Sequence, residues 1–251
     1  MASVAVYSPK GGVGKSTCAV NLAYLSAMSS KRRTLLWDID AQGAAGYLLG
    51  AHRQGHEAHR IFSKDVDPAE LAGPTPFLQL SLLAADTSLR RLDVQLVEED
   101  ARKRIRKLIR GLEKTFDRVV LDCPPGFTEI SEQIFRAVDL IVIPVPPSPL
   151  GMRAFEESVA YIRDKRGIGP PVLPVLSMVD MRRKLHRGMV SAHPDWHAVP
   201  YASVVERMSA ERAPLAAFAP RHPAAWAFAA IWADIEQRLI AIEAGPQMDP
   251  R

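Results

Sequence analysis

The chain has 251 residues, of which 47% are hydrophobic and 24% charged, and its formal net charge is +4. This composition is ordinary for a globular protein with a substantial core, and the length suits one large α/β domain or two small ones. No apolar run approaches the roughly 20 residues of a membrane-spanning helix. The mild basic excess permits binding to nucleic acid or an anionic surface but requires neither.

Short apolar runs alternate with amphipathic stretches along the chain. The pattern predicts strands over residues 2–7, 34–39, 78–83, 118–121, 140–145 and 172–176, and helices over residues 15–28, 101–114, 151–166 and 224–242. Residues 51–76 have no clear period, and we expect a loop or insertion there. Strand-like sequence begins at Val4, so we expect neither a signal peptide nor a separate DNA-reading domain before it.

Near-continuous apolar strands that alternate with helices are typical of a parallel sheet covered on both faces. We therefore predict an α/β fold with a doubly wound, mostly parallel sheet and helices on both faces. We expect a single domain over residues 1–251, ending in a flexible tail over residues 244–251. Ligands of such sheets bind at the carboxyl ends of the strands. Cys18 and Cys123 have no zinc-ligand spacing, and we expect reduced, packed thiols.

A glycine-rich segment lies between the first predicted strand and the first predicted helix, with the sequence Lys10-Gly11-Gly12-Val13-Gly14-Lys15-Ser16-Thr17. It matches the end of the phosphate-loop pattern G-x-x-x-x-G-K-[ST], although Pro9 stands where the first glycine is expected. Glycines let the backbone present N–H groups to phosphate oxygens, and the helix that follows points its positive end at them. Lys15 would neutralise the β- and γ-phosphates, Ser16 would bind Mg²⁺, and Thr17 would reach the α-phosphate. The segment predicts ATP binding with Mg²⁺.

Lys10, ahead of the double glycine, makes the chain resemble the deviant Walker A ATPases. This P-loop family includes the ParA and Soj partition proteins, MinD and the nitrogenase iron protein, and the resemblance runs from Val4 to about Leu239. It implies ATP hydrolysis and a homodimer in the ATP state, in which Lys10 reaches the partner's phosphates. The residues alone show only a cation beside the loop.

Two further segments carry carboxylates at predicted strand ends. Residues 35–43 resemble the family's D-x-D-x-Q-G segment, and alternation places Asp38 and Asp40 on the same side. The resemblance implies that Asp40 positions the attacking water. Asp38 would assist around Mg²⁺ through water, or it would merely cap the following turn. Residues 118–126 resemble the Walker B strand and its switch loop, so Asp122 would hold Mg²⁺ through its water shell.

Weaker signals concern the base and nucleic acid. Val199, Pro200 and Tyr201 resemble the family's base-binding region, and the resemblance suggests that Pro200 and Asp180 contact adenine. One basic cluster lies over residues 102–110, where a solvated helix face is the favoured interpretation. A second comprises Arg182, Arg183, Lys184 and Arg187, with Arg207 and Arg212 as an extension. For this cluster a solvated surface and a DNA-phosphate surface are equally good interpretations. His52, His56 and His59 have helical spacing, but an exposed polar segment is favoured over a metal site.

The resemblance implies an ATP-driven positioning switch of the small ParA type. It would dimerise with ATP, bind DNA nonspecifically, and respond to a ParB-like adaptor or cargo protein that stimulates hydrolysis. The expected location is the cytoplasm, on the nucleoid, without stable membrane association. The alternatives are a MinD-like membrane switch, for which the last nine residues are unsuitable, and a metabolic ATP-dependent synthetase. An iron–sulfur reductase is rejected because the two cysteines lie in the phosphate-loop helix and the switch loop.

Overall fold

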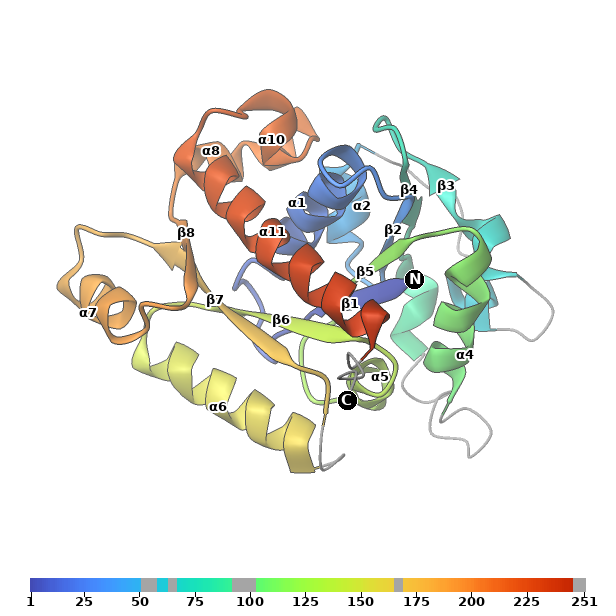
Figure 1. The fold of residues 1–251 in the computed structure, drawn as a ribbon, viewed down its shortest axis with the longest axis horizontal. Coiled ribbons are helices and arrows are strands. Elements are labelled where there is room, and N and C mark those ends of the chain that lie inside the picture. The colour runs from blue at the N-terminus through green and yellow to red at the C-terminus, as the bar shows by residue number, and fades with distance from the viewer. Residues whose placement is uncertain (51–57, 63–66, 92–102, 165–168, 246–251) are drawn as a thin grey trace, which may run out of the picture.

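The computed structural model describes residues 1–50, 58–62, 67–91, 103–164 and 169–245. One eight-stranded sheet forms its centre, with the strand order β3-β4-β2-β5-β1-β6-β7-β8 (Figure 1). All neighbouring strands are parallel except β3 and β4. The strands are β1 (Ala2–Val6), β2 (Thr34–Asp38), β3 (Gly73–Pro74), β4 (Leu80–Leu83), β5 (Arg118–Asp122), β6 (Leu140–Val145), β7 (Val172–Val179) and β8 (His197–Pro200).

Helices cover both faces of the sheet, which confirms the predicted α/β fold. They are α1 (Lys15–Met28), α2 (Ala44–Leu48), α4 (Arg104–Gly111), α5 (Glu129–Phe135), α6 (Pro149–Asp164), α7 (Lys184–Ala192), α8 (Ser203–Glu206), α9 (Met208–Glu211), α10 (Leu215–Phe218) and α11 (Pro223–Ala244). In the described part of the chain, no helix combines the length and apolar character that a membrane span requires.

Two apolar cores, one on each face, follow from the alternation of side chains along the strands. Val4 and Val6 of β1 pack with α1 and α11, whereas Ala5 and Tyr7 pack with α4, α5 and α6. Figure 1 shows the two helical layers on opposite sides of the strands. Both cysteines are free and buried, as expected, and burial raises the pKa of the Cys18 thiol to about 12. Because helices cover both faces of the sheet, a ligand has its place at the carboxyl ends of the strands.

Buried charges attach α11 to the start of β5. The Arg118 side chain is only 2% exposed, and its guanidinium pairs with Glu236 at 2.9 Å and with Glu243 at 2.8 Å. Arg32 adds a further contact to Glu236 at 2.9 Å. A buried guanidinium is tolerated because its donors are matched by carboxylates. This network fixes the long C-terminal helix across the sheet.

The sequence misplaced or missed several elements. Residues 51–76, expected to be a loop or insertion, include 3-10 turns at Ala58–Phe62 and Pro68–Leu71 and the short strand β3. The strands β3 and β8 and the helices α2, α5, α7, α8, α9 and α10 were not predicted. The helix expected over residues 151–166 begins two residues earlier, and its described part runs to Asp164, whereas the one over residues 224–242 extends through Ala244. The remainder of the expected tail, residues 246–251, lies outside the described residues.

Candidate functional site

The phosphate loop connects the end of β1 to the start of α1, as predicted. Gly12 and Gly14 have φ values of +72° and +94°, which L side chains rarely adopt. Gly14 is the N-cap of α1, and this helix has neither a side-chain cap nor an acidic residue in its first turn. Its free N–H groups therefore suit an external anion.

A cavity of about 570 Å³ opens on this loop. Its wall comes from the phosphate loop with the start of α1, the segment after β2 with α2, the switch loop, β7 and α9. The lining residues are Gly11, Gly12, Gly14, Lys15, Ser16, Thr17, Asp40, Gln42, Ala44, Tyr47, Leu48, Pro125, Met178 and Ser209. The structure thus brings together the predicted phosphate-binding residues, except Val13, and Asp40. We call this space the phosphate cavity.

Lys15 lines the phosphate cavity, and the carboxylate of Asp122 lies close enough to interact with its charge. The Lys15 ammonium donates to the Lys10 carbonyl at 3.0 Å. Burial lowers the pKa of Lys15, while the charges of Asp122 and Asp40 act in the opposite direction. Asp122 is fully buried, and neither carboxylate oxygen has a hydrogen-bond partner in the described structure. Burial raises its pKa to about 7.

This unpaired carboxylate is the feature that fits a cation. The nearby Ser16 hydroxyl favours the charged form of Asp122, although no hydrogen bond of ordinary geometry joins them. A hydroxyl and a carboxylate are hard oxygen ligands of the kind that Mg²⁺ prefers, with water completing its shell. The donor set therefore fits the predicted ion.

Asp38 and Asp40 occupy different environments. Asp38 is buried, and its carboxylate accepts hydrogen bonds from the backbone N–H groups of Asp40, Ala45 and Gly46 at 3.1–3.3 Å. This arrangement supports the alternative in which Asp38 caps the turn before α2, and a role near Mg²⁺ stays a prediction. Asp40 is half-buried and lines the phosphate cavity, and its carboxylate accepts from the Gln42 N–H at 3.0 Å.

The switch loop after β5 is tied to the start of the phosphate loop. The Gly126 N–H donates to the Pro9 carbonyl at 3.1 Å, and the Tyr7 hydroxyl donates to the Gly126 carbonyl at 3.0 Å. Gly126 has a φ of +93°, so a glycine is needed there. These two hydrogen bonds connect the switch loop to the end of β1 and to the start of the phosphate loop.

Lys10 points away from its own phosphate cavity. Its ammonium donates to the Leu150 carbonyl, in the first turn of α6, at 2.5 Å. Its reach to a partner's phosphates stays a prediction.

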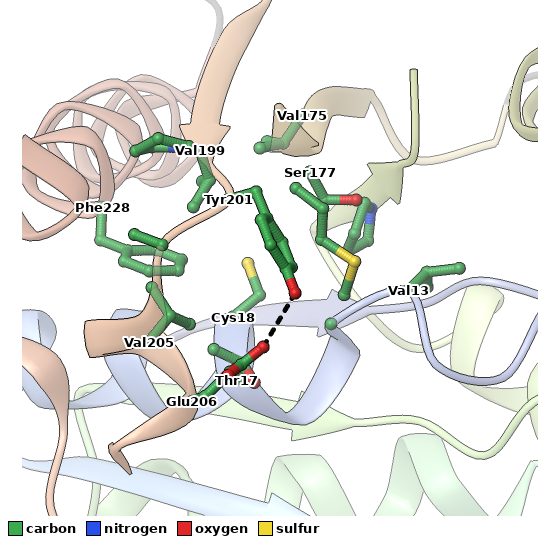
Figure 2. A pocket seen from close by; sticks show the side chains of 15 residues that line it. Val13, Thr17, Cys18, Val175, Ser177, Val199, Tyr201, Val205, Glu206 and Phe228 are labelled. Atoms are coloured by element: carbon green, nitrogen blue, oxygen red, sulfur yellow. Dashed lines mark hydrogen bonds between the residues drawn. The ribbon is translucent and has the colours of Figure 1, made fainter. Parts of the chain in front are cut away.

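A second, smaller pocket of about 170 Å³ adjoins the phosphate cavity and shares Gly14, Thr17 and Met178 with it. Its apolar wall includes Val175, Val199, Val205 and Phe228 (Figure 2). Pro200 lines it, where a base contact is predicted. Asp180 does not line it. Its carboxylate pairs with Arg182 at 2.9 Å and with Arg183 at 3.6 Å, and these arginines hold its pKa at about 2.

Tyr47 and Met178 are among the site residues that sequence reasoning missed. Tyr47 of α2 is 51% exposed and lines the phosphate cavity, and Met178 lines both spaces. Met178 has a φ of +57°, which is unusual for a residue other than glycine. No sequence signal marks either position, because a tertiary contact places each of them.

The predicted DNA-binding residues fall into two groups. Arg182, Arg183, Lys184 and Arg187 are exposed on the segment that joins β7 to α7 and on the start of that helix, at one end of the molecule (Figure 1). Arg207 and Arg212 belong to the α9 region. There Arg207 pairs with Glu211, and the Arg212 guanidinium lies 4.6 Å from the Tyr47 ring centre.

The predicted histidine group cannot be placed, because His52 and His56 lie outside the described residues. Within the described ranges, no cluster of three or more His, Cys, Asp or Glu side chains is arranged to hold a metal ion.

Comparisons with known proteins agree with this geometry. A family model described as an AAA domain matches residues 1–166. The chromosome partitioning protein ParA of Myxococcus xanthus is 32% identical over 195 residues, which cover 74% of this chain and 68% of that protein. Soj of Bacillus subtilis, a sporulation initiation inhibitor, is 32% identical over 145 residues, or 57% of each chain.

Solved structures extend the likeness of fold to nearly the whole chain. Apo McdA from Cyanothece has a TM-score of 0.81 at 19% identity, covering 95% of this chain and 99% of that one. MinD of Pyrococcus horikoshii, complexed with Mg-ADP, has a TM-score of 0.77 at 19% identity, covering 97% and 99%. The resemblance predicted from Lys10, the double glycine and the strand-end carboxylates is confirmed: the chain belongs to the ParA/Soj family of P-loop ATPases.

Proposed function

We propose that this chain is an ATP-dependent dimerising switch, which binds DNA nonspecifically in its ATP state and positions DNA or a protein cargo. The observation that carries the proposal is the unpaired, buried Asp122 beside Lys15 and Ser16, two residues that line the phosphate cavity. A carboxylate without a partner in the protein is costly unless a cation joins it on binding. Mg²⁺ with ATP supplies that charge.

The proposed chemistry is phosphoryl transfer to water. Ser16 and Asp122 would hold Mg²⁺, which neutralises charge on the β- and γ-phosphates when bound. Lys15 contributes a second positive charge from a buried position, where it is poorly screened. The free N–H groups at the start of α1 bind phosphate oxygens, with Thr17 at the α-phosphate. The chain thus provides position and charge, as this reaction requires.

Asp40 orients the water that attacks the γ-phosphate. Its half-buried carboxylate lines the cavity, and its bond to the Gln42 N–H fixes one of its oxygens. Gly126 would move in response to the γ-phosphate, and its hydrogen bonds to Pro9 and Tyr7 would carry that movement to the phosphate loop and β1. Lys10 leaves Leu150 and reaches the phosphates of a second copy, which makes the ATP state a homodimer.

The DNA surface of the proposal is the exposed group Arg182, Arg183, Lys184 and Arg187. Such residues bind the phosphate backbone and give affinity that falls with salt. A ParB-like adaptor or a cargo protein would stimulate hydrolysis and release the dimer. The relatives named as partition proteins support this cycle, which would take place in the cytoplasm on the nucleoid.

The test combines ATP hydrolysis with DNA co-sedimentation, each with and without ATP. The variants are Lys15→Ala and the double variant Arg182→Ala/Arg183→Ala. The matched control is Arg106→Ala/Arg110→Ala, which removes the same charge from exposed positions on α4, at the other end of the sheet. We expect Lys15→Ala to lose hydrolysis and ATP-dependent DNA binding. The Arg182/Arg183 variant should keep hydrolysis and lose DNA binding, while the α4 variant keeps both.

Other outcomes would contradict the proposal. No DNA affinity at low salt, or ATP-dependent binding to anionic vesicles in its place, would favour the membrane switch. Hydrolysis that appears only with an amine and a carboxylic acid substrate would favour a synthetase. If both double variants lost DNA binding equally, the DNA surface would not be specific to the β7–α7 segment.

A further inference from the structure

The apolar pocket beside the phosphate loop contains a buried hydroxyl group without a partner. Ser177 is 7% exposed, and its Oγ makes no hydrogen bond. Over the described ranges of the chain, the carboxylate of Asp122 is the only other buried side-chain group in this situation. Leaving such a group unpaired costs free energy, so each case in a folded protein needs an explanation.

The backbone at this position is itself irregular. In the pairing of β7 with β8, Leu176 lies opposite Ala198 and Val179 lies opposite Pro200. The strand β7 therefore has one residue more than its neighbour, which is a bulge, and bulges redirect side chains. The extra length falls at Ser177 and at Met178, whose φ is +57°. Strain of this kind persists where a binding site uses it.

The surroundings of Ser177 show what it faces. Figure 2 shows Val205 and Phe228 across the pocket from Ser177, with Thr17 and Cys18 of α1 nearby. At the rim, the Tyr201 hydroxyl is already engaged, because it donates to Glu206 at 3.0 Å. Ser177 is thus a buried polar side chain without a partner in a mainly apolar space that adjoins the phosphate cavity.

We propose that Ser177 recognises the nucleotide base, through a hydrogen bond from its hydroxyl to the polar edge of adenine. This inference rests on the proposed nucleotide function and names a base-contacting residue for it. Adenine has apolar faces that suit the pocket, and its edge carries an amino donor beside a ring-nitrogen acceptor. A serine hydroxyl both donates and accepts, so it can pair with either group. The phosphates would then occupy the adjoining cavity through the shared residues Gly14 and Thr17.

The test compares two ligands in two variants by titration calorimetry with Mg²⁺. ATP carries a base, and inorganic tripolyphosphate does not. We expect Ser177→Ala to weaken ATP binding by about three- to tenfold, the range for one lost neutral hydrogen bond, and to leave tripolyphosphate binding unchanged. Ser16→Ala, in the phosphate cavity, should weaken both ligands.

A second measurement separates recognition from a structural role. Removing an unpaired hydroxyl should leave the free energy of unfolding of the ligand-free protein unchanged or higher, whereas a structural hydroxyl would lower it when removed. Unchanged ATP affinity in Ser177→Ala overturns the inference, as do equal losses for ATP and tripolyphosphate. If the wild-type chain binds neither ligand, the proposed function fails and the inference fails with it. If the wild-type chain binds both ligands and Ser177→Ala binds them with the same affinities, only the inference about Ser177 fails.

Discussion

Replacing Asp122 by asparagine should make the nucleotide-free protein more stable at alkaline pH while it removes ATP hydrolysis. The carboxylate is fully buried without a hydrogen-bond partner in the described structure, and burial raises its pKa from 3.8 to about 7. Between these values the native state keeps a proton that the unfolded chain has released. The free energy of unfolding therefore falls as the pH rises through this window.

The magnitude follows from the same shift. A carboxyl pKa that rises on folding from 3.8 to about 7 corresponds to roughly 4 kcal/mol of lost stability once the group is fully ionised. About 3 kcal/mol of this loss falls between pH 5 and pH 8. Asparagine has a similar shape and no charge, so the Asp122→Asn variant should not show this part of the pH dependence.

The assay is urea unfolding followed by tryptophan fluorescence, without nucleotide or Mg²⁺, at pH 5 and pH 8. Taking the difference between wild type and variant at each pH cancels the other titrating groups. Asp195→Asn, at an exposed turn, is the control and should change stability by less than about 0.5 kcal/mol. Parallel pH profiles for wild type and Asp122→Asn would refute the reasoning.

Three further predictions concern other features. Arg118→Ala removes the most buried partner of Glu236 and Glu243, which keep Arg32 and the N-terminal ammonium, and should cost about 3 kcal/mol of unfolding free energy. Arg153→Ala, from an exposed pair with Glu157, should cost less than about 1 kcal/mol. Similar losses in urea unfolding would contradict the role given to burial. Gly126→Ala should cost at least about 1 kcal/mol in the same assay, because of its positive φ. Gly111→Ala, at a helical φ with open space around it, should be neutral or stabilising, and the reverse order would be contrary to expectation. Asp180→Asn should strengthen DNA binding at low salt, because it releases Arg182 from its ion pair. The control is Asp195→Asn, which changes the net charge by the same amount. Equal affinities by fluorescence anisotropy would count against competition between Asp180 and DNA.

The sequence predicted the parts of the site that local signals specify. The phosphate loop is a continuous motif, and β1, β2 and β5 are apolar runs that end at functional residues, so their placement needed no tertiary information. The strand β8 was missed because it has only four residues and is completed by pairing with β7. The helix α7 was missed because none of its residues is buried, which leaves no apolar stripe to detect.

The remaining site residues depend on contacts that only the fold creates. Asp180 was expected at the base by resemblance, but two arginines that follow it in sequence occupy its carboxylate. Ser177 looks like an ordinary strand residue until its burial and its lack of a partner are known. The opposite environments of Asp38 and Asp40, one surrounded by backbone donors and the other open to the cavity, likewise arise from the turn that leads into α2.

The contact between Lys10 and the Leu150 carbonyl bears on how strongly two copies would associate. A lysine free in water would contribute its full interaction with the partner's phosphates. Here it first has to give up an acceptor within its own chain, so only the difference between the two interactions favours association. In the proposed dimer, a bridging lysine that already has an acceptor within its own chain would lower the affinity between the two copies. Such a dimer would separate more readily once hydrolysis removes one of the phosphates that the lysine contacts.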